Sequence, residues 1–510
     1  MKTLRLLSRY NGTIFLAGAA GLLLVANGRN AMPWAAWLAP IGVMRYLRTT
    51  RGRYALAVAG LVLFLTWLFQ CRGMVPLPFM GVVAVGAVYT IAGLLPYALD
   101  RWLHARVLQF RGSLVFPCAV VAVEFALCSF CPYGSWGAVA YSQYGDLPLL
   151  QLAALTGVFG ISFLVSWLAP VVNWGWEQQW TGPRVRRGFA LFVTVVAMVF
   201  AGGAARLIWS PSAGETVRIA GIAPDEFQLF PSGEAAGRYW SRQPLSDEEW
   251  KFVRSAQTRV QDQLLAKTER EARAGARLVM WSEAAAPVLR VDEPALIARG
   301  AAIARAQHIY LGLGIISYDR DQPRPVQNKF VLVGPEGRVL SEYWKARPVP
   351  GSEAMMTETN GNGIQVADTE LGRIGSFICF DLDFPSLVRQ AGRAGVDILL
   401  APSSDWRDID PIHSHMAIFR AIENGCTLVR AVGHGRSVAT DARGRLLAQS
   451  DYFDDGDHVL VANLPTQGVR TAYARIGDGF AWLCVGALIL VPFTSRGSRT
   501  DVGSEHRPKS

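Results

Sequence analysis

The stretch Arg373–Pro385 reads RIGSFICFDLDFP, and it decides which fold we expect. Its first six residues are mostly apolar and favour a strand, whereas the proline at its end favours the start of a helix. Cys379 therefore lies on a sharp strand-to-helix turn, where the backbone presents the side chain and a helix N-terminus favours the thiolate. A nucleophile is one interpretation of this pattern, and a small buried hydrophobic cysteine is the other.

Two charged residues upstream follow strand-like runs in the same way. Glu283 comes directly after the apolar run Arg277–Ser282. Lys345 follows a predicted hairpin whose arms are Lys329–Val333 and Arg338–Trp344, joined by a turn rich in glycine and proline. Each charge on its own fits a solvated strand end. Together with the cysteine, they place a carboxylate, an ammonium group and a thiol at the ends of separate strands.

The order Glu283, Lys345, Cys379 resembles the catalytic set of the nitrilase (carbon–nitrogen hydrolase) superfamily. The segments Asp397–Trp406 and Arg420–Asn424 extend this resemblance. It implies an αββα sandwich in which Glu283 is the general base toward the thiol. Lys345, with backbone N–H groups near Cys379, would stabilise the oxyanion of each tetrahedral intermediate. Acyl transfer through such a thioester needs no metal and no organic cofactor, so we expect neither.

Composition indicates a membrane protein. Apolar residues make up 51% of the 510 residues, only 18% are charged, and there are 16 tryptophans. Several apolar stretches reach the roughly twenty residues that cross a bilayer. The stretches are Asn11–Ala26, Ala31–Met44, Tyr54–Gln70, Leu77–Leu99, Ser113–Cys131, Leu147–Trp174, Gly188–Trp209 and Ile476–Thr494.

These stretches predict a membrane α-helical bundle combined with an α/β domain. We expect about seven transmembrane helices over residues 1–210, the nitrilase-like domain over residues 217–467, and an eighth transmembrane helix over residues 476–495. A cleaved signal peptide is the alternative for the first stretch. The six further apolar stretches before Val217 favour a span instead.

Basic residues predict the orientation of the helices. They gather at the N-terminus, in alternate loops and in the tail 496–510, whereas the intervening loops carry only Arg29 and Arg72. The positive-inside rule places the basic segments in the cytoplasm and the 217–467 domain outside it. Because these segments account for much of the net charge of +10, no nucleic-acid partner is required. The basic residues are Lys2, Arg5, Arg9, Arg45, Arg48, Arg51, Arg53, Arg101, Arg106, Arg111, Arg184, Arg186, Arg187, Arg496, Arg499, Arg507 and Lys509.

Neither the cysteines nor the histidines form a metal-binding motif. Among the seven cysteines, Cys128 and Cys131 are spaced to pair in an oxidising compartment, although we favour an incidental spacing. His413 and His415 lie two residues apart, and no cluster of cysteines or carboxylates completes them in the sequence. We therefore expect no metal site.

The predicted layout resembles that of the apolipoprotein N-acyltransferase family over nearly the whole chain: a membrane bundle, an outward-facing nitrilase-like domain and a closing span. Ser135–Gln143 and Thr156–Ser162 are similar to a loop and the following helix of that family. The resemblance assigns supporting roles to Glu353, eight residues after the lysine, and to Phe380 and Asp381 beside the nucleophile.

This resemblance implies an integral protein of the bacterial inner membrane that acts as a monomer, with its catalytic domain in the periplasm. An acyl chain from a phospholipid would pass to Cys379 as a thioester, and then to the α-amine of diacylglyceryl-cysteine at the N-terminus of an apolipoprotein. Both substrates are anchored in the bilayer, so the site would lie at the outer leaflet. Phe227, Phe230 and Trp240 are candidates for an apolar lid, or equally for the domain core.

Three segments depart from the usual pattern of the family, namely residues 220–227, 346–353 and 432–436. They bear on substrate entry and loop support rather than on the chemistry. The alternative function is therefore a membrane-anchored amidase or nitrilase in which water, not a lipoprotein amine, resolves the acyl-enzyme. A non-catalytic membrane scaffold is a third alternative, and the intact Glu283, Lys345 and Cys379 argue against it.

Overall fold

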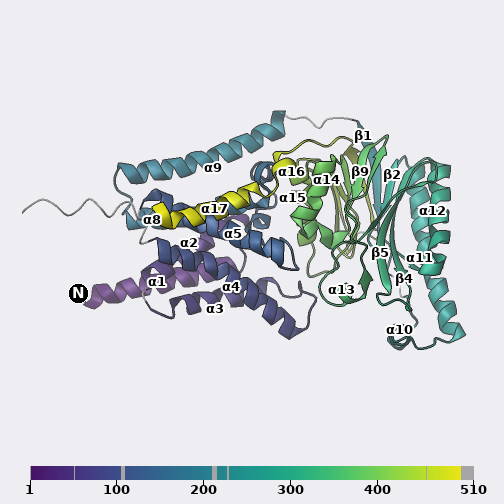
Figure 1. Ribbon diagram of the computed structural model, residues 1–510, viewed down its shortest axis with the longest axis horizontal. Coiled ribbons are helices and arrows are strands. Elements are labelled where there is room, and N and C mark those ends of the chain that lie inside the picture. The colour runs from purple at the N-terminus through teal and green to yellow at the C-terminus, as the bar shows by residue number, and fades with distance from the viewer. Residues whose placement is uncertain are drawn as a thin grey trace, which may run out of the picture.

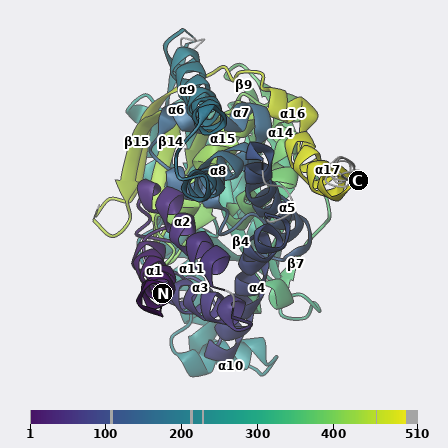
Figure 2. The same cartoon turned by 90° about the vertical axis from the view of Figure 1, so that its left-hand side faces the viewer.

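A computed structural model describes residues 2–50, 52–104, 109–209, 215–226, 229–454 and 456–494. A helical bundle forms one end of the molecule and an α/β domain the other (Figure 1). The C-terminal helix returns along the bundle, and α8 lies within it beside α2, α5 and α9 (Figure 2). The helices of the bundle are α1 (Lys2–Leu23), α2 (Pro33–Thr49), α3 (Ala55–Gln70), α4 (Phe79–Leu103), η1 (Phe110–Leu114), α5 (Val115–Phe130), η2 (Val139–Gln143), α6 (Leu147–Leu150), α7 (Ala153–Thr156), α8 (Val158–Glu177), α9 (Pro183–Trp209) and α17 (Gly479–Thr494).

Within the described residues, four helical segments are long and apolar enough to cross a membrane: Phe79–Leu103, Phe110–Phe130, Val158–Glu177 and Pro183–Trp209. The remaining apolar helices are shorter. The prediction of one continuous span over Leu147–Trp174 was wrong in its first part, because α6 and α7 are separate short helices that precede α8. The backbone breaks at Gly157, whose φ of 65° suits glycine and ends α7.

The α/β domain contains two large β-sheets that pack face to face. The first has the strand order β16-β1-β2-β4-β5-β6, with β3 beside β4 and β7 beside β5, and the second has the order β15-β14-β12-β10-β9-β8. Helices α11 and α12 cover the first sheet, and α14 and α15 cover the second on the side of the bundle (Figure 1). The expected αββα sandwich is present.

The elements of this domain follow in chain order. The helices are α10 (Gly233–Trp240), α11 (Asp247–Arg273), η3 (Arg290–Asp292), α12 (Glu293–Gln307), α13 (Ser352–Met356), η4 (Cys379–Asp383), α14 (Pro385–Ala394), α15 (Ile412–Asn424) and α16 (Ala472–Ile476). The strands are β1 (Thr216–Ile222), β2 (Leu278–Trp281), β3 (Ala286–Leu289), β4 (Tyr310–Tyr318), β5 (Val326–Val333), β6 (Val339–Trp344), β7 (Thr357–Glu358), β8 (Val366–Thr369), β9 (Gly372–Ser376), β10 (Ile398–Leu400), β11 (Ser403–Ser404), β12 (Thr427–Arg430), β13 (Val432–Gly433), β14 (Arg436–Thr440), β15 (Leu446–Asp451) and β16 (Val459–Pro465).

Local sequence explains the elements that carry the site. The β5–β6 hairpin is confirmed as an antiparallel pair that closes with Val333 opposite Val339. Every residue of β5 is buried, as expected for a strand covered on both faces. On the outer layer, Ser246 and Glu249 form a capping box that starts α11.

Loops of the bundle contact the α/β domain through buried hydrogen bonds. The N–H and the hydroxyl of Ser135 both donate to the Asp383 carbonyl, each at 2.7 Å. The Val158 N–H donates to the Glu423 carboxylate at 2.9 Å, and the Gln151 amide donates to the Arg443 carbonyl at 3.0 Å. These contacts join η4, α15 and the turn after β14 to the bundle.

Candidate active site

Cys379 lies on the predicted strand-to-helix turn, three residues after the end of β9 and at the start of the short 3₁₀ helix η4. Its φ of 48° is in the left-handed region, which is uncommon for a residue other than glycine and is a form of strain found at functional sites. Its N–H donates to the Pro402 carbonyl at 2.9 Å. The next N–H, on Phe380, belongs to the first turn of η4 and has no acceptor within that helix. This N–H, one residue after the nucleophile, is therefore a backbone donor that suits an oxyanion.

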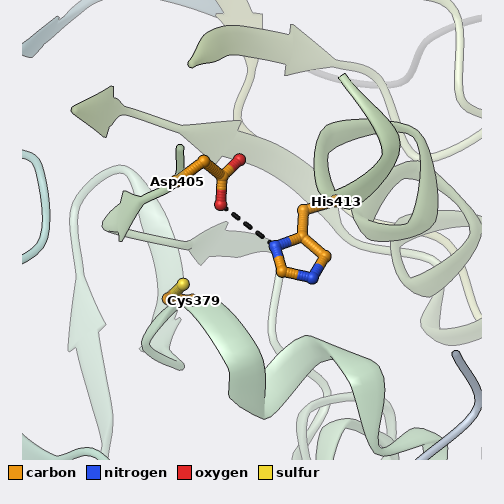
Figure 3. A group of neighbouring side chains, drawn as sticks. All are labelled: Cys379, Asp405 and His413. Carbon is orange, nitrogen blue, oxygen red and sulfur yellow. Dashed lines mark hydrogen bonds and ion pairs between the residues drawn. The ribbon is translucent and has the colours of Figure 1, made fainter. Parts of the chain in front are cut away.

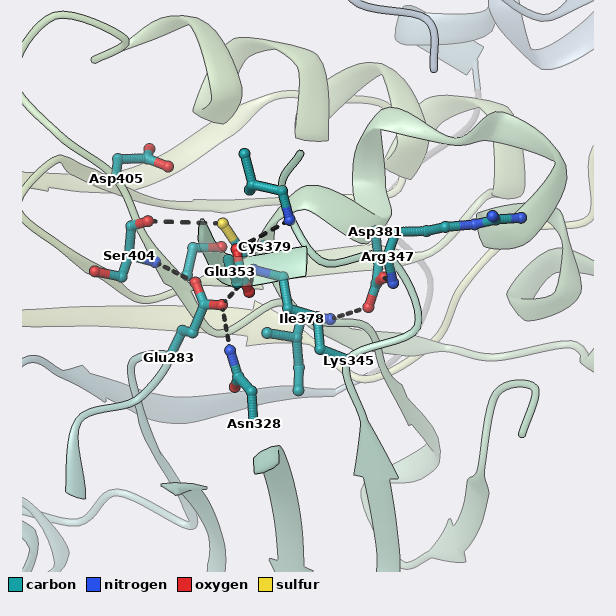
Figure 4. A network of polar contacts seen from close by, with 12 residues as sticks. Glu283, Asn328, Lys345, Arg347, Glu353, Ile378, Cys379, Asp381, Ser404 and Asp405 are labelled. Carbon is teal, nitrogen blue, oxygen red and sulfur yellow. Dashed lines mark hydrogen bonds and ion pairs between the residues drawn. The ribbon is translucent and has the colours of Figure 1, made fainter. Parts of the chain in front are cut away.

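The structure brings Glu283, Lys345 and Cys379 together from three strand ends (Figure 4). Glu283 Oε1 accepts hydrogen bonds from Lys345 Nζ and Asn328 Nδ2, both at 2.7 Å. Its Oε2 accepts from the Ser404 N–H at 2.8 Å, while the Cys379 thiol faces the Ser404 carbonyl at 3.7 Å. The same residue, Ser404, thus contacts both the carboxylate and the thiol.

Lys345 is an almost fully buried cation between two carboxylates. Its Nζ lies 2.7 Å from Glu283 and 2.6 Å from Glu353, and its side chain is 2% exposed. Burial alone lowers the pKa of an ammonium group, but the two carboxylates outweigh burial and hold the pKa of Lys345 well above its usual value. Lys345 therefore carries a permanent positive charge, as an oxyanion-stabilising group requires.

The thiol of Cys379 is protonated at rest, which corrects the expectation that its position favours the thiolate. Burial raises its pKa well above the usual value, and the Glu283 carboxylate raises it further, against the opposing effect of Lys345. The helix that begins at Cys379 is only five residues long, so it offers little dipole to offset burial. A base must therefore take the thiol proton during attack.

The three residues assigned supporting roles lie in different places. Glu353, on α13, contacts Lys345 directly, and its second oxygen accepts the Val349 N–H at 3.0 Å. Asp381 points away from the thiol and accepts hydrogen bonds from the Arg347 N–H at 2.7 Å, the Tyr343 hydroxyl at 2.9 Å and the Ile378 N–H at 3.0 Å. It clamps the loop after Lys345 to the turn that carries Cys379.

Phe380 presents an apolar ring and can support the oxyanion only through its backbone. The ring packs against Phe384, with centroids 5.4 Å apart, and lies near His413, at 6.4 Å. It lines a small cavity with Met74 and Trp136 from the bundle. Met74 and Trp136 also line a larger, mostly apolar cavity of about 270 Å³ among α2, α3, α4 and α5.

Sequence reasoning missed a buried polar group behind the thiol. One ligand atom each of Cys379, Asp405 and His413 lies within 4.8 Å of the others (Figure 3). The expectation that no cluster of cysteines or carboxylates completes the histidines was wrong for His413, because Asp405, eight residues before it, and Asp383, on η4, both contact its ring. Arg430 donates to both oxygens of Asp405, at 3.0 and 3.1 Å, so a guanidinium cation already holds the carboxylate that a metal ion would need.

The other missed residues gave no distinct signal. Asn328 precedes a buried lysine in the hairpin, and Ser404 falls within the segment Asp397–Trp406 without a motif of its own. His415 faces elsewhere, stacked on Tyr144 with ring centroids 3.5 Å apart.

The remaining sequence expectations concern the cysteine pair, the lid and the basic tail. Cys128 and Cys131 are free thiols. Phe230 and Trp240 pack in an aromatic cluster with Tyr239. Phe227, Arg51, Arg106 and the tail 496–510 lie outside the described residues.

Two protein-family models match the chain. The apolipoprotein N-acyltransferase N-terminal domain matches residues 19–171, and the carbon-nitrogen hydrolase family matches residues 246–474. An apolipoprotein N-acyltransferase of Geobacter metallireducens is 29% identical over 85% of this chain and 84% of that protein. One of Gloeobacter violaceus is 25% identical over 92% of this chain and 93% of that protein.

Among solved structures, an amidase from Nesterenkonia sp. is similar at 20% identity, with a TM-score of 0.42, over 53% of this chain and 97% of that protein. The two family models match the bundle and the α/β domain in succession, and the two relatives cover most of the chain. The chain therefore belongs to the apolipoprotein N-acyltransferase family.

Proposed function

We propose that the chain moves a fatty acyl chain from a phospholipid, through a thioester on Cys379, to the N-terminal amine of diacylglyceryl-cysteine in an apolipoprotein. The observation that carries this function is a buried Glu–Lys–Cys site directly against the membrane bundle of a chain from this family. Met74 and Trp136 line both the bundle cavity and the small cavity at Phe380, which supports an apolar path for the acyl chain toward the turn that carries the thiol.

In the first half-reaction, the Cys379 sulfur attacks the ester carbonyl carbon of the phospholipid while Glu283 takes the thiol proton. Lys345 and the Phe380 N–H stabilise the oxyanion of the tetrahedral intermediate. The ester C–O bond then breaks, and the lysophospholipid leaves with the proton that Glu283 returns. The product is an acyl thioester on Cys379.

In the second half-reaction, the α-amine of the acceptor attacks the thioester carbonyl. Glu283 accepts one amine proton, the C–N bond forms and the C–S bond breaks, and the proton passes to the departing thiolate. Glu353 acts through Lys345, because its carboxylate is the second one that contacts the ammonium group beside Glu283. Asp381 fixes the loop that follows Lys345.

A trapped intermediate tests this function. Purified protein given phospholipid without an acceptor should gain one acyl chain, in a linkage that neutral hydroxylamine cleaves, as measured by intact-protein mass spectrometry. A diacylated lipopeptide with a free amine should discharge it. The Cys379→Ala variant should gain no acyl chain, and labelling that persists in this variant would move the nucleophile elsewhere. Rapid discharge by water alone would establish an amidase instead.

We further propose four regions with fixed sides of the membrane: a cytoplasmic N-terminus leading into about seven spans over residues 1–210, a periplasmic catalytic domain over residues 217–467, a closing span over residues 476–495 and a cytoplasmic tail over residues 496–510. The distribution of basic residues supports this orientation in the bacterial inner membrane. All proposed catalytic side chains come from one chain, which supports a monomer as the active unit.

Reporter fusions test the orientation. A reporter active only outside the cytoplasm should work when fused after Trp209 and fail when fused after Arg496. The reverse pattern would refute both the orientation and the acceptor, because the lipoprotein amine would then be on the wrong side of the membrane.

A further inference from the structure

His413 is a buried histidine flanked by two carboxylates. It lies on α15 and is 5% exposed. Its Nδ1 lies 3.0 Å from Asp405 Oδ1, and its Nε2 lies 3.7 Å from Asp383 Oδ2. That Asp383 oxygen is buried and has no hydrogen-bond partner among the described residues. A protonated imidazole donates a hydrogen bond to Asp405 and places its positive charge 3.7 Å from Asp383, so this geometry favours the charged form of His413.

Asp405 is fixed from two sides. Arg430 donates to both of its oxygens, and His413 contacts one of them (Figure 3). The Asp405 N–H donates to the Gly433 carbonyl at 2.8 Å. Both the side chain and the backbone of Asp405 are therefore held in a single position.

This position determines where the preceding residue, Ser404, lies. The Ser404 N–H donates to Glu283 at 2.8 Å, and the Ser404 carbonyl faces the Cys379 thiol at 3.7 Å (Figure 4). Movement of Asp405 would shift the base and the nucleophile relative to each other. A displacement of about 1 Å at such a site can cost about a hundredfold in rate.

His413 also affects how easily the Cys379 thiol loses its proton, because it is one of several charged groups around the sulfur. Glu283 and Asp405 oppose formation of the thiolate, whereas Lys345 and Arg430 favour it. A cation at His413, within 4.8 Å of the sulfur, offsets Asp405. A charge at 4–6 Å typically moves the pKa of its neighbour by about 1–3 units.

We propose that His413 is a positioning residue for the nucleophile: its bond to Asp405 holds Ser404 between Glu283 and Cys379, and its positive charge makes the thiolate easier to form. This role rests on the proposed function of Cys379. Its test uses the thiol alone and needs neither lipid nor acceptor, so failure of acyl transfer and failure of this role are distinguishable.

The rate of alkylation of Cys379 by iodoacetamide measures thiolate formation. The full-length protein in detergent is alkylated from about pH 6 to about pH 9, and the modified cysteine is quantified by peptide mass spectrometry. His413→Gln retains a donor for Asp405 but carries no charge. At the low end of this range we expect alkylation about tenfold slower than in the wild type, because one pKa unit changes the thiolate fraction tenfold.

The pH dependence separates charge from packing. Burial lowers the pKa of His413, but Asp383 and Asp405 outweigh burial and raise it above the usual value, against the opposing effect of Arg430. The wild type keeps the charge below that pKa and loses it above. The difference in alkylation rate between the wild type and His413→Gln should therefore narrow as the pH rises. A difference that is the same at every pH, or none, would overturn the electrostatic role.

Two further variants complete the test. His415→Gln is the matched control on the same helix: burial lowers the pKa of His415 to about 3, so the change removes no charge, and alkylation should stay at the wild-type rate. Asp383→Asn removes a partner of His413 but leaves its backbone contact with Ser135. Asp383→Asn should therefore also slow alkylation of Cys379, and it serves as the test if His413→Gln does not fold. A faster rate in Asp383→Asn would contradict the proposed role of His413.

Discussion

Replacing Lys345 by methionine should abolish catalysis, and a second buried lysine provides a matched control. The change removes the ammonium group that lies 2.7 Å from Glu283 and 2.6 Å from Glu353, while keeping most of the side-chain volume. Loss of one charged donor to an oxyanion typically lowers turnover by about a hundred- to a thousandfold. Breaking a buried ion pair by removing one partner also costs about 3–5 kcal/mol of folding free energy.

Lys329→Met separates these two effects. Lys329 is on β5 next to Asn328, but successive residues of a strand face opposite sides, and its ammonium group pairs with the buried Glu293 instead of the site. Both variants should therefore lose a similar amount of stability, with melting temperatures in detergent lower by on the order of 10 °C. Only Lys345→Met should lose acyl transfer.

The assay measures acyl transfer to a diacylated lipopeptide per folded molecule, at a temperature well below both melting transitions. Turnover of Lys345→Met that equals that of Lys329→Met would show that Lys345 serves stability alone. Such a result would remove the ammonium group from the proposed oxyanion site and leave the Phe380 N–H as the remaining donor that we propose there.

Three further predictions concern carboxylates. Glu283→Gln should lower the yield of thioester on Cys379 by about a hundredfold, because no base takes the thiol proton; near-normal labelling by mass spectrometry would assign that role to another group. Glu353→Ala should lower turnover by up to about a hundredfold through a misplaced Lys345, and normal turnover would make Glu353 a simple loop residue. Burial raises the pKa of Asp381 to about 7 from 3.8, so its folded form binds a proton more tightly and its contribution to stability falls as the pH rises through that window. In the wild type, this contribution lowers the melting temperature as the pH rises from about 4 to about 7. Asp381→Asn should reduce that dependence of melting temperature on pH, and an unchanged dependence would contradict the raised pKa of Asp381.

The sequence predicted the parts of the fold that local pattern determines. The hairpin before Lys345 and the turn at Cys379 are encoded by runs of apolar residues with glycine or proline at their ends, and both are present. A charged residue directly after such a run also marks a strand end, which is why Glu283 and Lys345 could be identified without coordinates. Their convergence came from family resemblance and not from periodicity.

The rest of the site depends on contacts between distant segments. Asp405 and His413 carry no motif, and their meeting with Asp383 requires the packing of α15 over the second sheet. The state of the thiol was predicted wrongly for a related reason: burial depends on the whole fold, and it outweighs the local helix end. Hydropathy likewise could not divide the stretch from Leu147, where the break depends on the backbone of Gly157.

The two hydrogen bonds from Ser135 to the Asp383 carbonyl limit the modularity of the protein. The carbonyl belongs to the helical turn that begins at Cys379, and its donors belong to the bundle, as does the Val158 N–H that binds Glu423. Cutting the chain at residue 210 would expose the Asp383 carbonyl and the Glu423 carboxylate and remove these hydrogen-bond donors. The bundle and the α/β domain are therefore not interchangeable units. A chimera with a different membrane segment must keep residues 131–158 together with the catalytic domain. Substitutions on one side of this junction should accordingly require matching changes on the other.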